Sequence, residues 1–220
     1  MNGATSRSSF LTPGAHTDLS ILTRWARRSG RHAWSISRSG DSRSAISPSH
    51  VYCFISKISE KMTEQQIEAR AQRATELFKQ GFNCAQAVFA SCADLYGITD
   101  EQLALRLSAS FGGGMGRMRL VCGAASGMFM LAGLQNGSAT PHDNEGKMAN
   151  YAFVQQLAGD FKAKYGSLIC AELLGLAPKG QCNCQLDLDP RPAERTSEYY
   201  KKRPCPEMIA EAVRIYLRSL

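Results

Sequence analysis

Residues 122–134 read CGAASGMFMLAGL, and this stretch decides the fold. Its residues are apolar or small on every side, which is typical of a helix buried at the centre of a domain. Gly123, Ala124, Ser126 and Gly127 keep one side of the helix free of bulky groups, so a neighbouring backbone can approach closely. We therefore expect a central buried helix with the other elements packed around it.

Three helices are predicted before this stretch. Thr63 with Gln66, and Thr99 with Gln102, form the capping-box pattern that begins a helix. Asn83 is placed to cap the helix between them, and Gly97 to end it. The predicted ranges are about 64–80, 84–96 and 100–109. A glycine-rich loop, FGGGMG at 111–116, then leads into the central helix.

Three more helices are predicted after it. Pro141 and Asp143 begin a long helix that runs to about residue 165, and Ser167 caps a short one that ends at Gly175. Residues 176–203 are expected to form a polar connection. Pro206 suits the first position of a final helix through about residue 217, with Cys205 as its cap. Because no run alternates between apolar and polar residues, we expect an all-α, single-domain bundle of about six helices over residues 62–220.

Basic charge is concentrated in the first 61 residues. They hold 9 of the 26 Lys and Arg residues and 3 of the 19 Asp and Glu residues, and thus +6 of the net charge of +7. The rest of the chain is nearly neutral. A general basic surface for nucleic acid is therefore not expected.

Residues 1–61 are rich in Ser and Arg and have little hydrophobic periodicity, so we expect a disordered extension. Two interpretations remain open: an organellar transit peptide, or a misplaced start with Met62 as the true initiator. No run approaches the roughly 18 apolar residues of a membrane span, and no secretory signal is recognisable. We expect a cytoplasmic protein without membrane insertion, whose thiols are reduced or reversibly oxidised.

Four of the eight cysteines are predicted to lie in the first turn of a helix: Cys84, Cys122, Cys170 and Cys205. Unpaired backbone N–H groups at a helix start favour an anion, so this position is expected to lower the pKa of a thiol. These four are our candidate catalytic residues. We expect Cys122 to be the attacking thiol because it follows the glycine-rich loop, and the choice of resolving cysteine stays open.

The remaining candidates carry weaker signals. Cys92 lies on the apolar face of its helix and is expected to be core, whereas Cys182 and Cys184 form a C-x-C in a polar loop that supplies half of a zinc site at most. His142 is interpreted as a surface residue next to a helix cap.

The glycine-rich loop does not match a phosphate-binding pattern, and we interpret it as a tight turn. Arg117 and Arg119, which follow it, either hold an anion beside Cys122 or are simply solvated.

A set of motifs resembles one known family. They are Asn83-Cys84-Ala85, the FGGGMG loop, CGAASG at 122–127, the later Cys170, and Arg203-Pro204-Cys205. Together they resemble the C_GCAxxG_C_C family, small bacterial and archaeal proteins described as redox-active, with four characteristic cysteines and a CGAxxG motif. The resemblance covers roughly residues 64–218 and implies that the family cysteines correspond to Cys84, Cys122, Cys170 and Cys205.

These observations favour a thiol-based redox protein whose redox partner is unknown. Whether it is an enzyme, namely an oxidoreductase, stays open at this point. The alternative is a metal-binding module in which Cys84, Cys122, Cys170 and Cys205 hold an iron–sulfur cluster or zinc, since soft thiolate ligands select such metals. A helical interaction module with structural cysteines is a third hypothesis. The substrate and the oligomeric state do not follow from the sequence.

Overall fold

The structure is a computed structural model that describes residues 62–180, 189–192, 194, 196–201 and 203–220. The expectations for residues 1–61, and those for Cys182 and Cys184, lie outside the described residues. Within the described part of the chain there are eight α-helices and no strand, which confirms the all-α fold class. The helices are α3 (Glu64–Lys79), α4 (Cys84–Ala90), α5 (Glu101–Ser108), α6 (Gly123–Asn136), α7 (Asn144–Tyr165), α8 (Cys170–Leu173), α9 (Ser197–Lys201) and α10 (Cys205–Arg218).

Several helices begin where the sequence predicts. The Thr63 side chain caps α3 in a reciprocal capping box with Gln66. The Asn83 side chain accepts from the backbone N–H groups of Ala85 and Gln86, 3.1 and 3.0 Å away, and so caps α4. Each cap satisfies N–H groups that have no partner within the helix itself.

Other boundaries differ from the prediction. Asp100, not Thr99, caps α5, because its carboxylate accepts from the Leu103 N–H. The cap of α8 is Ile169; the Ser167 hydroxyl instead accepts from the Ile169 N–H, 2.9 Å away, and fixes the turn before the helix. Cys205 is the first residue of α10 and Pro204 is its cap.

Two further differences concern helix extent. The helix predicted over 84–96 is divided into α4 and a 3-10 turn, Ala93–Tyr96. The connection expected over 176–203 contains α9. Neither change introduces a strand among the described residues.

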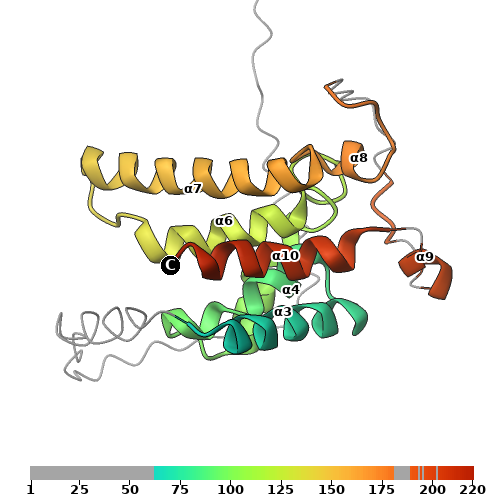
Figure 1. Cartoon of the computed structure of the whole chain (residues 1–220), viewed down its shortest axis with the longest axis horizontal. Helices are drawn as coiled ribbons and strands as arrows, with labels where there is room; N and C mark the ends of the chain where they lie inside the picture. The colour runs from blue at the N-terminus through green and yellow to red at the C-terminus, as the bar shows by residue number, and fades with distance from the viewer. Residues whose placement is uncertain (1–61, 181–188, 193, 195, 202) are drawn as a thin grey trace, which may run out of the picture. The chain divides into compact units, whose positions relative to one another are not determined.

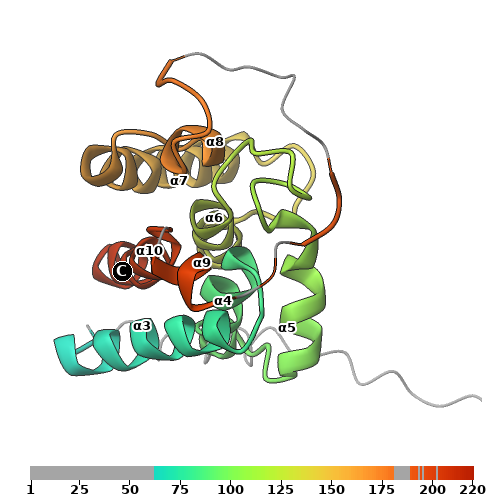
Figure 2. The same ribbon diagram turned by 90° about the vertical axis from the view of Figure 1, so that its right-hand side faces the viewer.

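Helix α6 lies at the centre of the bundle (Figures 1 and 2), where it packs against α4, α7 and α10. Eight of its residues are buried, as expected for its apolar and small sequence. A Cβ at Gly127 would lie 2.8 Å from the Ala85 carbonyl oxygen, so this glycine permits the close approach of α4. The predicted buried central helix is confirmed.

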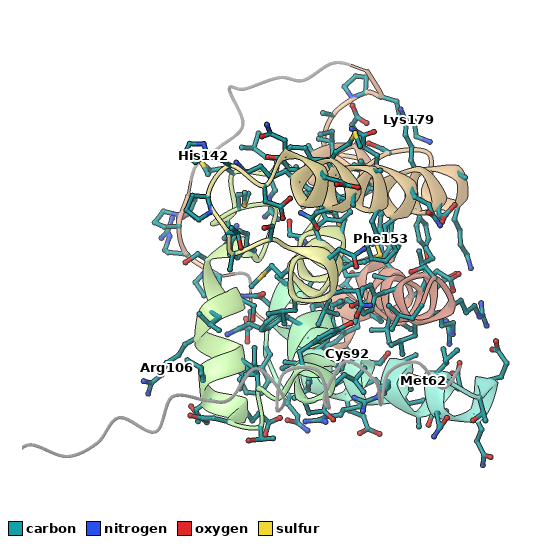
Figure 3. The ribbon with its side chains drawn as sticks, turned by 90° about the vertical axis from the view of Figure 1, so that its left-hand side faces the viewer. Met62, Cys92, Arg106, His142, Phe153 and Lys179 are labelled. Atoms are coloured by element: carbon teal, nitrogen blue, oxygen red, sulfur yellow. The ribbon has the colours of Figure 1, made fainter. Side chains whose placement is uncertain are left out.

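The C-terminal helix connects the two sides of the bundle. Arg214 of α10 forms an ion pair with Glu68 of α3, with 2.8 Å between Nε and Oε2. Tyr216 is fully buried, and its hydroxyl bonds to the hydroxyl of Tyr96 and to the Leu131 carbonyl oxygen. Phe153 of α7, labelled in Figure 3, packs against the Tyr216 ring, with ring centroids 6.4 Å apart.

None of the described helices combines the length and the apolar character that crossing a membrane demands.

Candidate functional site

The four candidate cysteines all lie at helix starts, as predicted. Cys84, Cys170 and Cys205 are the first residues of α4, α8 and α10, and Cys122 is the cap residue of α6. Helices α6 and α10 begin at the end of the bundle where α7 ends and α8 follows (Figure 1). The fold thus brings together cysteines that are far apart in the sequence.

A short antiparallel pairing of two backbone segments holds Cys122 next to Cys170. The Cys122 N–H donates to the Leu168 carbonyl at 2.8 Å, and the Cys170 N–H donates to the Leu120 carbonyl at 2.6 Å. Val121 and Ile169 are the directly opposed residues between them. Since successive side chains of extended backbone point to opposite sides, Cys122 and Cys170 lie on the same side of this pairing.

Two glycines allow backbone to contact the cysteines directly. A Cβ at Gly123 would lie 2.7 Å from the sulfur of Cys84, and a Cβ at Gly114 would lie 2.7 Å from the Cβ of Cys170. Gly114 also has a φ of 73°, in the left-handed region that side chains disfavour. Glycine is therefore required at both positions for close packing around the thiols.

The loop between α5 and α6 contains several residues with a left-handed backbone conformation. Beyond its glycines, Met115, Arg117 and Arg119 have φ values of 62, 66 and 62°. Such left-handed conformations are uncommon outside glycine and cluster at functional sites. Backbone bonds from the N–H groups of Arg117 and Arg119 to Gly112 and Gly113 hold the loop in this form.

Burial shifts the pKa of three of the thiols in the direction opposite to the prediction. Cys122 is 7% exposed, and burial followed by the charge of Cys84 raises the pKa of Cys122 above its ordinary value. The same two causes raise the pKa of Cys170, and they raise that of Cys205 to about 12. The expected lowering at helix starts is therefore wrong for these three, because desolvation of the thiolate outweighs the favourable helix start.

Cys84 is the cysteine whose charge acts on all three others. Like Cys205 it is only partly buried, whereas Cys122 and Cys170 are buried. Its charge raises the pKa of each of Cys122, Cys170 and Cys205. It also lines a pocket of about 360 Å³. Cys84 is therefore both the common neighbour of the other thiols and the one that a small molecule in this pocket would contact.

The pocket includes residues for which the sequence offers no signal. Arg203 and Tyr199 line it, although they lie more than 100 positions after Cys84. The guanidinium carbon of Arg203 lies 4.6 Å from the centroid of the Tyr199 ring, a cation–π contact. Only the chain path through α9 brings them to the loop, so no local pattern predicts them.

The other candidates have separate positions. Cys92 (Figure 3) is fully buried in the core, as predicted. Burial raises the pKa of Cys92 to about 11. His142 is exposed in the loop before α7, which confirms its interpretation as a surface residue. Among the described residues, no group of three or more His, Cys, Asp or Glu side chains is arranged to hold a metal ion.

Comparison with known proteins gives one match. A family profile described as "Putative redox-active protein (C_GCAxxG_C_C)" matches residues 82–218, a range that includes all four candidate cysteines. No protein with a curated description and no solved structure matches the chain.

Proposed function

Because the chain belongs to the C_GCAxxG_C_C family, whose members are described as redox-active, we propose that it exchanges thiols and disulfides at the cysteine cluster. Cys84 is the attacking thiol and Cys122 the resolving thiol. The observation that carries this proposal is the position of Cys84, which lines a pocket while it lies near enough to the other three cysteines for its charge to raise their pKa values. This assignment replaces our expectation from sequence that Cys122 attacks first.

The first step forms a mixed disulfide. The Cys84 thiolate attacks one sulfur of a disulfide substrate, the substrate's S–S bond breaks, and the leaving thiolate takes up a proton. Cys122 is poorly suited to this step, because it is buried and its raised pKa keeps it protonated at neutral pH.

The second step forms a disulfide within the protein. Cys122 attacks the sulfur of Cys84, releases the second substrate thiol, and leaves a Cys84–Cys122 bond. Two protein thiols are oxidised and one substrate disulfide is reduced to two thiols. The negative charge of Cys84 contributes to the raised pKa of Cys122, and the mixed disulfide removes that charge. Formation of the mixed disulfide therefore favours ionisation of the resolving thiol.

Mapping of the bridge after single turnover tests the proposal. The reduced full chain is treated with one equivalent of a small disulfide, alkylated and digested with trypsin. Lys and Arg positions place Cys84, Cys122, Cys170 and Cys205 on separate peptides: 80–106, 120–147, 165–179 and 203–214. A cross-link between peptides 80–106 and 120–147 is expected.

Two outcomes would contradict the proposal. If all four cysteines remain alkylated as free thiols, disulfide exchange at this cluster is excluded. A bridge from Cys84 to Cys170 or Cys205 would overturn the role of Cys122. Cys92 shares peptide 80–106 with Cys84, so fragmentation must locate the bridge, and Cys92→Ala should leave it unchanged because Cys92 lies in the core.

A further inference from the structure

The pocket at Cys84 combines the thiol with positive charge. Its lining includes three arginines, Arg117, Arg119 and Arg203, and no Asp or Glu among the described residues. Arg117 and Arg119 come from the loop between α5 and α6, where both have a left-handed backbone conformation, and Arg203 comes from the segment before α10. Three guanidinium groups beside one thiol form an environment that attracts anions.

The arginines are only partly engaged by the protein. Nη1 of Arg117 is buried and has no hydrogen-bond partner in the described part of the chain. Asp189 lies near enough for Arg117 to contribute to its lowered pKa, but the main cause is a hydrogen bond from Arg191, whose Nε is 3.0 Å from Oδ1. A buried guanidinium N–H without an acceptor is costly, and a bound anion would remove that cost.

The size of the pocket suits a small molecule. About 360 Å³ is near the lower end of the range typical for ligand sites, about 300–1,000 Å³. The ligand must also present a sulfur to Cys84 and an anionic group to the arginines at once. Guanidinium groups bind carboxylates through paired hydrogen bonds, which fixes orientation as well as affinity.

We infer that the disulfide accepted at Cys84 is a low-molecular-weight disulfide whose halves carry carboxylates. The inference rests on the proposed function and adds its substrate class. Carboxylate binding by the arginines positions one sulfur against Cys84. Attack breaks the S–S bond, leaves one carboxylate-bearing half bonded to Cys84, and releases the other half as a thiol. The electron balance is that of the exchange described above and requires no further reactant.

A comparison of three small disulfides of different charge tests this inference. The reduced full chain is treated with dithiodiglycolate (anionic), bis(hydroxyethyl) disulfide (neutral) and cystamine (cationic). Modification of Cys84 is followed on peptide 80–106. Each rate is divided by the rate for the same disulfide with the urea-unfolded chain, which removes differences in intrinsic reactivity. The folded protein should favour the anionic disulfide over the cationic one by on the order of tenfold, and this preference should shrink in 1 M salt, where the Debye length is about 3 Å.

Single substitutions identify the groups responsible. Arg117→Gln and Arg203→Gln should each reduce the anionic preference several-fold. The matched control is Arg106→Gln, which removes an exposed arginine of α5 outside the pocket (Figure 3) and should leave the preference unchanged. Because this variant loses the tryptic site at residue 106, its Cys84 is followed on peptide 80–117.

Equal normalised rates for the three disulfides, or a preference for cystamine, would overturn the substrate class. A charge preference that Arg106→Gln reduces as much as Arg117→Gln would also overturn it, because net charge and not the pocket would then be responsible. Neither result affects the proposed exchange itself, which is excluded if all four cysteines remain free thiols after treatment with the disulfide.

Discussion

Gly123 contacts the sulfur of Cys84 so closely that a Cβ on Gly123 would lie 2.7 Å from it. The first residue of the central helix and the first residue of α4 are thereby packed against each other. Cys122 precedes Gly123, so this contact also brings the proposed resolving thiol next to the attacking thiol. This contact gives a physical reason for the Cys122-Gly123 pair of the family motif, because a side chain at residue 123 would collide with the Cys84 sulfur.

Gly123→Ala should destabilise the protein and reduce bridge formation. The added methyl group meets the Cys84 sulfur and, at 3.1 Å, the Phe111 carbonyl oxygen, so one of the two helices must shift. Overpacking of this kind costs about 1–3 kcal/mol. Urea unfolding gives the free energy, and peptide mapping gives the yield of the Cys84–Cys122 bond.

Two other glycines of α6 serve as controls. A Cβ at Gly133 meets nothing within 4 Å, so Gly133→Ala should stabilise the helix by about 0.5–1 kcal/mol and leave bridging intact. Gly127→Ala should destabilise through Ala85 and Val88 without touching the sulfur. If Gly127→Ala abolished bridging as fully as Gly123→Ala at equal residual folding, the contact with Cys84 would not be the cause.

The cap residue Asn83 supports both stability and chemistry. Its side chain caps α4 and also donates from Nδ2 to the Ala109 carbonyl at 2.8 Å, so it fixes the segment that carries Cys84. Asn83→Ala should cost about 1 kcal/mol and slow modification of Cys84 by on the order of tenfold, because reaction rates depend steeply on position.

Thr63→Ala is the matched control for Asn83→Ala. Thr63 caps α3 in the same reciprocal manner but lies on a helix without a candidate cysteine. The Thr63→Ala variant should lose a free energy of unfolding similar to that lost by Asn83→Ala, with no change in the rate at which Cys84 is modified. An equal fall in rate for the two variants would show that general destabilisation, not the cap of α4, controls the thiol.

Local signals in the sequence predict the fold well. Capping residues such as Thr63 and Asn83 act on neighbouring N–H groups, so short patterns locate helix starts and place all four cysteines there. The central helix follows from its composition. What these signals cannot predict is the burial of the thiols at helix starts, which depends on segments far apart in the chain and which reverses the expected pKa direction at Cys122.

The pocket shows the same limit. Arg117 and Arg119 are adjacent to a recognisable glycine-rich loop, but their left-handed backbone is fixed by bonds within the folded loop. Arg203 reaches the site only through the path of the chain around α9. Proximity to Cys84 is thus a property of the tertiary structure.

Stability should decline in alkali partly through Cys205. Burial, followed by the charge of Cys84, raises the pKa of Cys205 from an ordinary value of 9.0 to about 12. Below pH 9 both folded and unfolded chains hold this proton, so the free energy of unfolding does not depend on it. Between about pH 9 and 12 the unfolded chain releases the proton first, so stability falls as pH rises.

Urea unfolding at several pH values tests this linkage. With Cys205→Ala, the free energy of unfolding should fall less steeply between pH 9 and 11 than in the parent, by up to about 1.4 kcal/mol per pH unit. Below pH 8 the free energies of unfolding of variant and parent should depend on pH in the same way. The same slope in variant and parent above pH 9 would show that the Cys205 thiol is not held protonated by the fold.

Trapping of the mixed disulfide in cysteine variants shows which thiol attacks first. With Cys122→Ser, the first step proceeds but no resolving thiol follows, so the mixed disulfide should accumulate on Cys84 and appear as a mass addition on peptide 80–106. With Cys84→Ser, peptide 120–147 should remain unmodified, because Cys122 is buried and protonated. Cys92→Ala should behave as the parent chain, with a bridge and no trapped adduct. Rapid modification of Cys122 in the Cys84→Ser protein would reverse the assignment and make Cys122 the attacking thiol.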